Sequence, residues 1–327
     1  MSLKLLDIIP IMCYNNHVKL QTAWEESQMD YIKVSKAAEK WGISTRRVRV
    51  LCAEGKIPGV IRKGNLYMIP ENAQKPLDGR LTRTGILAEI ELKRDRLNEM
   101  RPLTPGEVKR LQEEFMIEFT YNSNAIEGNT LTLKETAMVL EGMTIDQKPL
   151  KDHLEAVGHR DAFLYVQDIA KQEVPLSEFV IKNIHSLVLM NQPEDKGVFR
   201  KIPVRIMGAY TEPVQPYLIE PKITELLAVN EERKVSMNVI ERIARFHLEF
   251  EGIHPFIDGN GRTGRLVMNL DLIRNGFPPI NVKFTDRKKY YDAFDAYYRD
   301  GNADAMTDLI AGYVNDRLNE YLEILSR

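Results

Sequence analysis

Cysteine and long apolar runs are both scarce in this sequence of 327 residues. The only cysteines are Cys13 and Cys52, too few for the disulfide framework of a small secreted protein, so we expect a reducing compartment. No apolar run approaches the roughly 18 residues that a membrane-spanning helix needs. The first residues loosely resemble a signal peptide, but Asp7 and Pro10 interrupt the apolar part, and we predict a cytoplasmic protein.

Internal repeats and low-complexity tracts are missing as well, which excludes a solenoid and a largely disordered chain. The composition, 43% hydrophobic and 28% charged, is that of an ordinary globular protein long enough for two domains. Residues 30–80 hold 11 Lys and Arg against 5 Asp and Glu, a net charge of +6, which leaves −8 for the rest because the whole chain carries −2. We therefore predict a tail of unclear role (1–29), a basic module (30–76) and a larger domain (77–327).

Helix start and stop signals fill the larger domain. Thr104 with Glu107 forms a capping box that predicts a helix ending at Gly128, and Thr132 with Glu135 forms a second one. Apolar residues at helical spacing predict further helices near 239–250 and 310–325. The exception is 198–219, where alternation and central Gly and Pro residues predict a β-hairpin. The fold class expected is mainly α, with one projecting hairpin.

One short segment concentrates groups that bind anions. It runs from His254 to Arg265 and reads HPFIDGNGRTGR. Glycines and a proline favour a loop whose exposed N–H groups form an anion nest, and the apolar residues that follow predict a helix beginning near Thr263 with its positive end at the loop. An anion nest at the positive end of a helix predicts a polyphosphate site; an incidental glycine-rich turn between two helices is the alternative.

The side chains of this segment supply the remaining chemistry. Arg262 and Arg265 lie three residues apart, about one helical turn, so both can face one anion. Asp258 is a hard oxygen ligand suited to Mg²⁺, and His254 can accept a proton near neutral pH. A base, a metal ligand and two arginines within 12 residues indicate a phosphate-transfer site.

The segment resembles the Fic domain signature HPFx(D/E)GNGRxxR, with every fixed position present. The resemblance extends from about Thr104 to the C-terminus. It implies an all-α enzyme that binds ATP and Mg²⁺ and transfers AMP to a Ser, Thr or Tyr hydroxyl of a target protein. On this resemblance His254 would take the proton of the hydroxyl, Phe256 would anchor the loop in the core, and Asp258 would hold Mg²⁺.

The resemblance also implies which residues hold the phosphates. Asn260 and the amides of Gly259 and Gly261 would bind them, Arg262 would stabilise charge on the α- and β-phosphates, and Arg265 would bind the γ-phosphate. Relatives that transfer a different phosphate-containing group have lysine at the second loop glycine, so Gly261 argues against that second interpretation.

The helix expected at about 106–128 ends in SNAIEG, which fits the family's inhibitory pattern (S/T)xxxE(G/N). Ser123, Glu127 and Gly128 occupy its fixed positions. The resemblance implies that Glu127 pairs with Arg265, occupies the place of the γ-phosphate and holds the enzyme inactive; a solvated helix-end glutamate is the alternative. Replacing Glu127 would then raise AMP transfer, including self-modification. In some relatives this glutamate positions a water that removes AMP, and the sequence leaves that activity open.

Two further elements have family counterparts. The hairpin matches the flap that holds the target peptide, which would use Ala209, Tyr210, Thr211, Glu212, Pro213, Val214, Gln215 and Pro216; an ordinary surface hairpin is the alternative. Tyr290 and Tyr291 lie where relatives often place an aromatic side chain against adenine, although core packing explains two helical tyrosines equally well.

The basic module resembles the excisionase and MerR winged helix-turn-helix units. Gly42 lies in the turn, Ser44 caps the second helix, and the Ile57–Ile69 segment is expected to form the wing. The candidate DNA contacts are Arg46, Arg47 and Arg49. A protein-interaction module is the alternative, and the sequence leaves a homodimer open. A different class of function also stays open: a DNA-binding transcription regulator whose Fic domain senses nucleotide.

Overall fold

The computed structural model describes residues 31–53, 55, 57–64, 66–75, 83–206 and 210–326, and the tail predicted for 1–29 lies outside them. Described residues 31–75 belong to one compact unit and residues 83–326 to a second, larger one. Within the described residues, no helix combines the length and the apolar character needed to cross a bilayer.

The small unit contains two helices and a three-stranded antiparallel sheet in the order β1-β3-β2. Its elements are β1 (Tyr31–Lys33), α1 (Val34–Trp41), α2 (Thr45–Ala53), β2 (Ile61–Lys63) and β3 (Leu66–Pro70). Gly42 has φ of +62° and ends α1, a conformation that glycine adopts without strain. The Ser44 hydroxyl accepts from the Arg47 amide at the start of α2, as the capping prediction required. The hairpin expected within 57–69 is present as β2 and β3.

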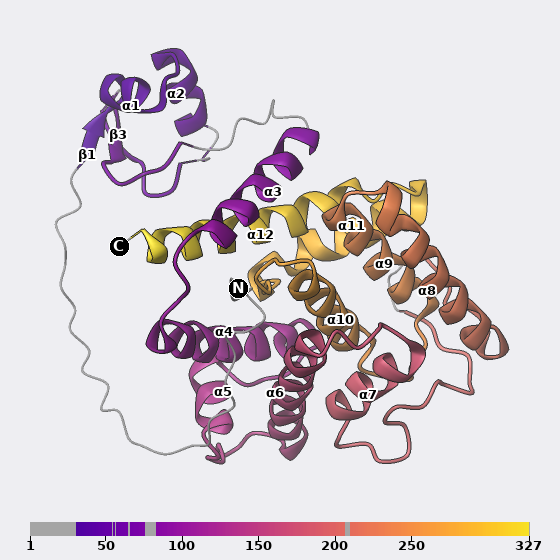
Figure 1. The fold of residues 1–327 in the computed structure, drawn as a ribbon. Helices are drawn as coiled ribbons and strands as arrows, with labels where there is room; N and C mark the ends of the chain where they lie inside the picture. The colour runs from indigo at the N-terminus through magenta and orange to yellow at the C-terminus, as the bar shows by residue number, and fades with distance from the viewer. Residues whose placement is uncertain are drawn as a thin grey trace. The chain divides into compact units, whose positions relative to one another are not determined.

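The large unit is helical, which confirms the mainly α prediction (Figure 1). Its helices are α3 (Arg83–Glu99), α4 (Pro105–Ile126), α5 (Leu133–Leu140), α6 (Leu150–Lys171), α7 (Glu178–Val188), η2 (Pro216–Leu218), α8 (Ile219–Ser236), α9 (Val239–Ile253), α10 (Asn260–Arg274), η3 (Phe284–Asp286), α11 (Arg287–Asp300) and α12 (Asp304–Leu325). Helix α10 lies in the middle of the unit and packs against α4, α6, α7 and α9.

Both predicted capping boxes form. Thr104 and Glu107 exchange side-chain and backbone hydrogen bonds at the start of α4, and Thr132 and Glu135 do the same for α5. Each such cap contributes about 1 kcal/mol. Helix α4 ends at Ile126, two residues before Gly128, whose φ of +96° turns the chain away.

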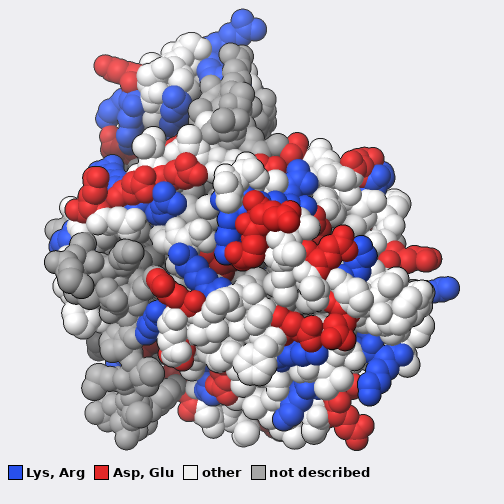
Figure 2. All heavy atoms as spheres, turned by 45° about the vertical axis from the view of Figure 1, so that its right-hand side comes forward, with Lys and Arg blue, Asp and Glu red and all other residues white. Residues whose placement is uncertain are grey.

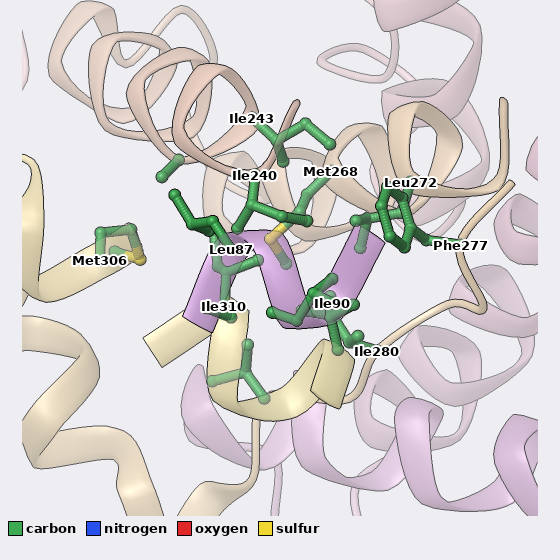
Figure 3. Packing of buried hydrophobic residues seen from close by; sticks show 14 of the residues in the cluster. Leu87, Ile90, Ile240, Ile243, Met268, Leu272, Phe277, Ile280, Met306 and Ile310 are labelled. Carbon is green, nitrogen blue, oxygen red and sulfur yellow. The ribbon is translucent and has the colours of Figure 1, made fainter. Parts of the chain in front are cut away.

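Two apolar clusters hold α10 from opposite sides. In the first, shown in Figure 3, Leu87 and Ile90 of α3 pack with side chains of α9, α10 and α12. The second joins α4, α6, α7, α8, α9 and the loop before α10, and includes Leu266 and Leu270 of α10. Met268 of α10 belongs to the first cluster. Since one helix serves both cores, its N-terminal end is fixed in position.

The β-hairpin predicted for 198–219 is not formed by the described residues of that segment. Residues 198–206 and 210–215 make a loop without strand pairing, followed by η2 and the start of α8. The backbone groups of this loop are bound instead by a side chain. Arg200 donates to the carbonyl oxygens of Ile202 and Val214. The prediction was therefore wrong about strand pairing, because alternation of side chains does not specify which partner satisfies the backbone.

Candidate active site

The chain turns sharply at His254, between α9 and the loop that precedes α10. His254 has φ of +51°, in the left-handed region that a residue other than glycine adopts at a cost, and Pro255 follows it. Arg200 holds this turn: its Nε donates to the His254 carbonyl oxygen at 2.8 Å, and its backbone N–H donates to the Pro255 carbonyl oxygen at 2.9 Å. The left-handed turn at His254 is therefore held by both the side chain and the main chain of Arg200.

The His254 imidazole is held in its neutral form. Burial lowers its pKa to about 4, and the nearby Arg200 cation acts in the same direction, while the Glu251 carbonyl group and the carboxylates of Glu127 and Asp258 oppose the shift. Its side chain is 21% exposed, and Nδ1 lies 3.9 Å from Glu251 Oε2. At neutral pH this imidazole can therefore accept a proton from a group that approaches it.

The N-terminus of α10 is opened by Gly259, which has φ of +75°. Its carbonyl oxygen accepts from Thr263 N–H, so the helix begins at Asn260, three residues earlier than the sequence predicted. The N–H groups of the first helical turn have no intrahelical partner and carry the positive end of the helix dipole. The Asn260 side chain, expected to bind phosphate, instead bonds both backbone groups of Phe256 at 2.9 Å. Anion binding at these positions thus falls to the main chain.

The loop between His254 and α10 is held by packing from α7. Phe256 is completely buried, as expected of an anchor, and its ring stacks on His185 with centroids 3.6 Å apart. His185 Nδ1 accepts from Gly197 N–H, and Nε2 therefore donates to the Asp258 carbonyl oxygen at 2.9 Å. Burial lowers the His185 pKa to about 4, so this tautomer stays neutral. His185 is a structural residue of the loop.

Arg262 lies beneath the loop, 1% exposed. Its Nη2 is 3.2 Å from Asp258 Oδ1, and its Nη1 is 3.1 Å from Glu155 Oε1. The second pair is close enough for an ion pair but lacks hydrogen-bond geometry, and within the described residues both Nε and Nη1 lack a hydrogen-bond partner. Arg262 is thus paired with two carboxylates, and its buried Nε is left without any partner in the described part of the chain, a donor that a ligand oxygen at this helix end could satisfy.

Asp258 is the residue of this loop best placed to contact a metal ion. Its side chain is 40% exposed, Oδ1 accepts from Gly259 N–H and Arg262, and Oδ2 accepts from Gln192 at 3.3 Å. Among the described residues no group of three or more His, Cys, Asp or Glu side chains is arranged to bind a metal. A single carboxylate can hold Mg²⁺ when phosphate oxygens of a substrate and water molecules supply the other ligands, which is how many phosphate-transfer sites bind this ion.

Arg265 binds the end of α4. Its Nε donates to the Ser123 hydroxyl at 3.1 Å, and Nη2 donates both to the Ser123 carbonyl oxygen at 2.7 Å and to Glu127 Oε1 at 2.8 Å. Arg265 is completely buried, whereas the Glu127 side chain is 32% exposed. The pairing of Glu127 with Arg265 that the sequence led us to expect is present, and its Glu127 end is open to solvent.

Gly261 shows where the Glu127 carboxylate lies. A Cβ atom added at Gly261 would collide with Glu127 Oε1 and come within 3.0 Å of Arg265 Nη1. The carboxylate thus rests against the first turn of α10, in contact with the helix end that attracts anions. Glutamate and an incoming phosphate would compete for this surface.

The two tyrosines of α11 have different environments. Tyr290 is 2% exposed, its hydroxyl is 2.6 Å from His247 Nε2, and it belongs to the first apolar cluster, the one that contains Leu87 and Ile90. Tyr291 is 39% exposed and donates to the Ile126 carbonyl oxygen at 3.5 Å, next to Glu127. Tyr290 therefore has the core-packing role, and of the two only Tyr291 is open to a ligand. His247, 1% exposed, is a core histidine.

Glu251 is a buried acid beside the site that the sequence did not reveal. It is 9% exposed, and its Oε1 has no hydrogen-bond partner among the described residues. Burial raises its pKa to about 8, and the negative charge of Glu127 adds to the shift while Arg265 opposes it. At neutral pH Glu251 is mostly protonated, so Arg265 has Glu127 as its main counter-charge.

These features agree with comparison to known proteins. Residues 175–272 match the Fic/DOC family. The match contains His254, the loop and Arg265, and it leaves out Glu127 and the small unit.

Named relatives support the Fic/DOC match. The chain is 35% identical over 211 residues to protein adenylyltransferase fic-1 of Caenorhabditis elegans, which covers 63% of this chain and 41% of the relative. It is 32% identical over 239 residues to protein adenylyltransferase Fic of Drosophila melanogaster, covering 72% and 48% respectively. The chain thus spans less than half the length of these curated relatives.

Solved structures support the fold. Fic-1 of C. elegans (residues 134 to 508 of that protein) superposes with a TM-score of 0.67 at 28% identity, covering 75% of this chain and 73% of that one. A Fic domain containing signaling protein from Bacteroides thetaiotaomicron gives a TM-score of 0.63 at 27% identity, covering 74% and 95%. The large unit therefore shares its fold with these Fic proteins.

The segment assigned to a flap lies partly within the described residues. Ala209 lies outside them. Tyr210 is 65% exposed, with its ring 4.7 Å from the Arg299 guanidinium, and Val214 is bound through its carbonyl oxygen by Arg200. Arg200 therefore connects the segment from 210 to 216 to the His254 turn, and all of these residues lie within the part of the chain that matches the Fic/DOC family.

The candidate DNA contacts lie on α2 of the small unit. Arg46 and Arg49 are exposed, and Arg47 is partly buried. The apolar side of the same helix, including Val48 and Leu51, packs in the small core. Basic residues and core residues therefore occupy different faces of α2.

Three residues important to the site escaped the sequence analysis. Glu155 faces Arg262, Arg200 holds the His254 turn, and Glu251 lies beside His254. Glu155 and Arg200 are far from the loop in the sequence, so only folding brings them to it. Glu251 could have been noticed, because a glutamate on the otherwise apolar face of a helix, three residues before the motif, is unusual.

Proposed function

We propose that this chain is a protein adenylyltransferase that transfers AMP from ATP to a Ser, Thr or Tyr hydroxyl of a target protein. The observation that carries the proposal is the N-terminus of α10, where the buried Arg262 has an Nε donor without a partner among the described residues and the loop before the helix begins at His254, whose imidazole is neutral. A polyphosphate supplies oxygen acceptors for this donor and for the free amides of the helix end, and a hydroxyl supplies the proton that the imidazole can accept. The naming of the relatives as adenylyltransferases supports the same reaction.

In the proposed reaction the hydroxyl oxygen of the target attacks the α-phosphorus of ATP. A bond forms between that oxygen and the phosphorus, the bond from the phosphorus to the bridging oxygen breaks, and pyrophosphate leaves. His254 takes the proton of the attacking hydroxyl, while Arg262, Arg265 and the first-turn amides of α10 bind the phosphates. Asp258 would provide the protein ligand to Mg²⁺, whose role when bound is to neutralise phosphate charge.

We further propose that Glu127 inhibits this reaction from within the chain. Its carboxylate pairs with Arg265 and rests against Gly261, so a γ-phosphate would meet negative charge and occupied space there. ATP bound beside Glu127 would then have its α-phosphorus misaligned with His254. Ser123 supports the inhibited arrangement by accepting from Arg265.

The target peptide, on this proposal, lies along residues 209–216, and the adenine ring lies near Tyr291. The placement of the target peptide is supported by Arg200, which binds the carbonyl oxygens of both Val214 and His254. The placement of the adenine ring is supported by the exposure of Tyr291 next to Glu127, since a base can stack only on an accessible ring.

A transfer assay with α-labelled ATP tests the enzyme. The Glu127→Gly variant is expected to label protein, its own chain included, more than the unmodified chain does, and the Glu127→Gly/His254→Ala double variant is expected to lose that labelling. If the Glu127→Gly variant binds ATP and transfers no label to any protein, the proposed activity is wrong.

A second proposal concerns residues 30–76, for which we infer DNA binding by a winged helix-turn-helix unit. Arg46 and Arg49 are exposed on α2, opposite its core face, and this part of the sequence is basic, whereas the visible face of the large unit carries intermingled charges (Figure 2). DNA binding without AMP transfer would favour a regulator that senses nucleotide over an enzyme.

A further inference from the structure

The Arg200 side chain connects the two arms of the 198–216 segment to the turn that carries His254. It is 5% exposed. Nη1 donates to the Ile202 carbonyl oxygen at 3.0 Å and Nη2 to that of Val214 at 2.6 Å, so the guanidinium bonds both arms of the segment. Nε and Nη2 also donate to the carbonyl oxygens of His254 and Ile253, at 2.8 Å and 3.4 Å.

These partners are all neutral carbonyl groups. None of the ion pairs formed by the described residues includes Arg200, although its guanidinium is buried. Burial of a cation without a carboxylate is costly, and here it lowers the Arg200 pKa. Two neutral backbone segments could be joined more cheaply by a short polar side chain or by direct pairing. The position of this charge therefore requires an explanation beyond fold stability.

We infer that Arg200 is a positioning residue for the reaction proposed above: it fixes the target-binding segment and the His254 turn in one relative position, with its charge beside the imidazole. The inference rests on the proposed function. A hydroxyl presented by residues near Val214 would then approach His254 at a distance set by a single side chain. Because His254 holds a left-handed backbone conformation, its carbonyl needs this bond to keep the imidazole directed at the site.

The charge of Arg200 has a separate consequence. Four charged or titratable groups face His254: Glu251 from α9, Glu127 from the end of α4, Asp258 from the loop, and Arg200. Arg200 is the cation among them and makes protonation of the imidazole harder, so the base stays neutral to lower pH. Removing the Arg200 charge raises the His254 pKa. The loss of transfer rate on the acid side of the pH profile, called the acid limb below, then begins at a higher pH.

The test uses the full chain with Glu127→Gly as the parent, and compares Arg200→Met and Arg200→Lys with Arg110→Met. Arg110 lies exposed on α4, outside the target-binding segment, so its replacement removes one charge without touching the His254 turn. Protein-bound label from α-labelled ATP, on the chain and on lysate proteins, is measured from below pH 4 to pH 8, and ATP binding is measured by calorimetry.

Arg200→Met is expected to transfer about 10- to 100-fold more slowly than the parent, with ATP affinity within about 3-fold and an acid limb at higher pH. Arg200→Lys keeps the charge but cannot reach four carbonyl groups, so it should be slowed without a shift of the acid limb. Arg110→Met should match the parent. A purely structural arginine would alter thermal stability and leave the pH profile in place.

The inference is overturned if Arg200→Met transfers at the parent rate, or if its loss of rate comes with an unshifted acid limb and an equal loss of ATP binding. Should Arg200→Met fail to fold, Arg200→Lys decides: transfer at the parent rate overturns the positioning role. A parent that binds ATP and labels nothing overturns the proposed function itself, which is distinguishable because the Arg200 variants then have no rate to compare.

Discussion

The carboxylate of Glu127 lies 2.8 Å from Nη2 of Arg265, a residue 138 positions later in the chain. One partner ends α4 and the other stands in the second turn of α10, so the contact joins the end of one helix to the start of the other. Ser123 binds the same guanidinium through its hydroxyl and its carbonyl oxygen. Because Arg265 is completely buried, it needs a counter-charge whenever no other anion is present.

Replacing Glu127 by Ala should raise the rate of AMP transfer several-fold or more and tighten ATP binding. The physical reason is that Arg265 and the first turn of α10 then lose their internal anion and are left for the γ-phosphate. Transfer from α-labelled ATP and calorimetric binding measure the two effects. Glu118→Ala, an exposed change on the same helix, is the control, and equal rates for the two variants would contradict inhibition by Glu127.

Replacing His254 by Ala should slow transfer by about 10²- to 10⁴-fold, the usual contribution of a positioned general base. ATP affinity should change little, because the phosphate-binding groups belong to α10. The comparison is made in the Glu127→Ala background, where the parent rate is high enough to measure the loss. His153→Ala, a histidine of α6, serves as a control for general loss of stability, and retained transfer by the His254 variant would remove the base from the mechanism.

Glu251→Gln should stabilise the protein more at pH 8 than at pH 5. The pKa of Glu251 is raised from 4.5 to about 8, mainly by burial, so between these values the folded chain keeps a proton that the unfolded chain has released. The free energy of unfolding therefore falls as the pH rises through this window, and glutamine removes that dependence. A gain of at least about 1 kcal/mol at pH 8 over pH 5 is expected from denaturant titrations. An equal gain at both pH values, or one matched by the exposed Glu232→Gln, would show that Glu251 ionises normally.

Asp258→Asn should raise the Mg²⁺ concentration that gives half-maximal transfer by about 10-fold or more, since one carboxylate supplies the protein charge for the ion. Asparagine has the same shape and can still accept from Gly259 N–H, so the loop should keep its conformation. The rate is measured against Mg²⁺ concentration at saturating ATP, with the exposed Glu194→Gln as the control. An unchanged Mg²⁺ requirement would place the ion elsewhere.

Duplex DNA should bind the full chain at low salt, with affinity that falls steeply as salt is raised. The cause is release of counterions from phosphates by Arg46, Arg49 and their neighbours. Fluorescence anisotropy of a labelled duplex at several salt concentrations gives the slope, and replacing Arg46 and Arg49 together by Gln should flatten it. If no duplex binds at low salt, residues 30–76 are better explained as a protein-interaction module.

Local signals predicted local structure well. The capping boxes at Thr104 and Thr132 fix hydrogen bonds between residues three apart, so the helix starts could be read directly. The hairpin predicted at 198–219 was wrong for the described residues, because alternation of polar and apolar residues says nothing about the partner that binds the backbone. That partner is the side chain of Arg200. Asn260 shows the same limit, since its side chain is used to shape the loop rather than left open to a ligand.

The sequence by itself determined that a loop rich in anion-binding groups precedes a helix, because neighbours along a chain share one turn and one helix end. It also determined, through resemblance to a family, that Glu127 would meet Arg265. Only the tertiary structure decided that Arg262 is buried with an Nε donor left over, that Glu251 is a buried acid with a raised pKa beside His254, and that Arg200 joins two distant segments. Burial and long-range contact create these properties, and neither is encoded in the spacing of residues along the chain.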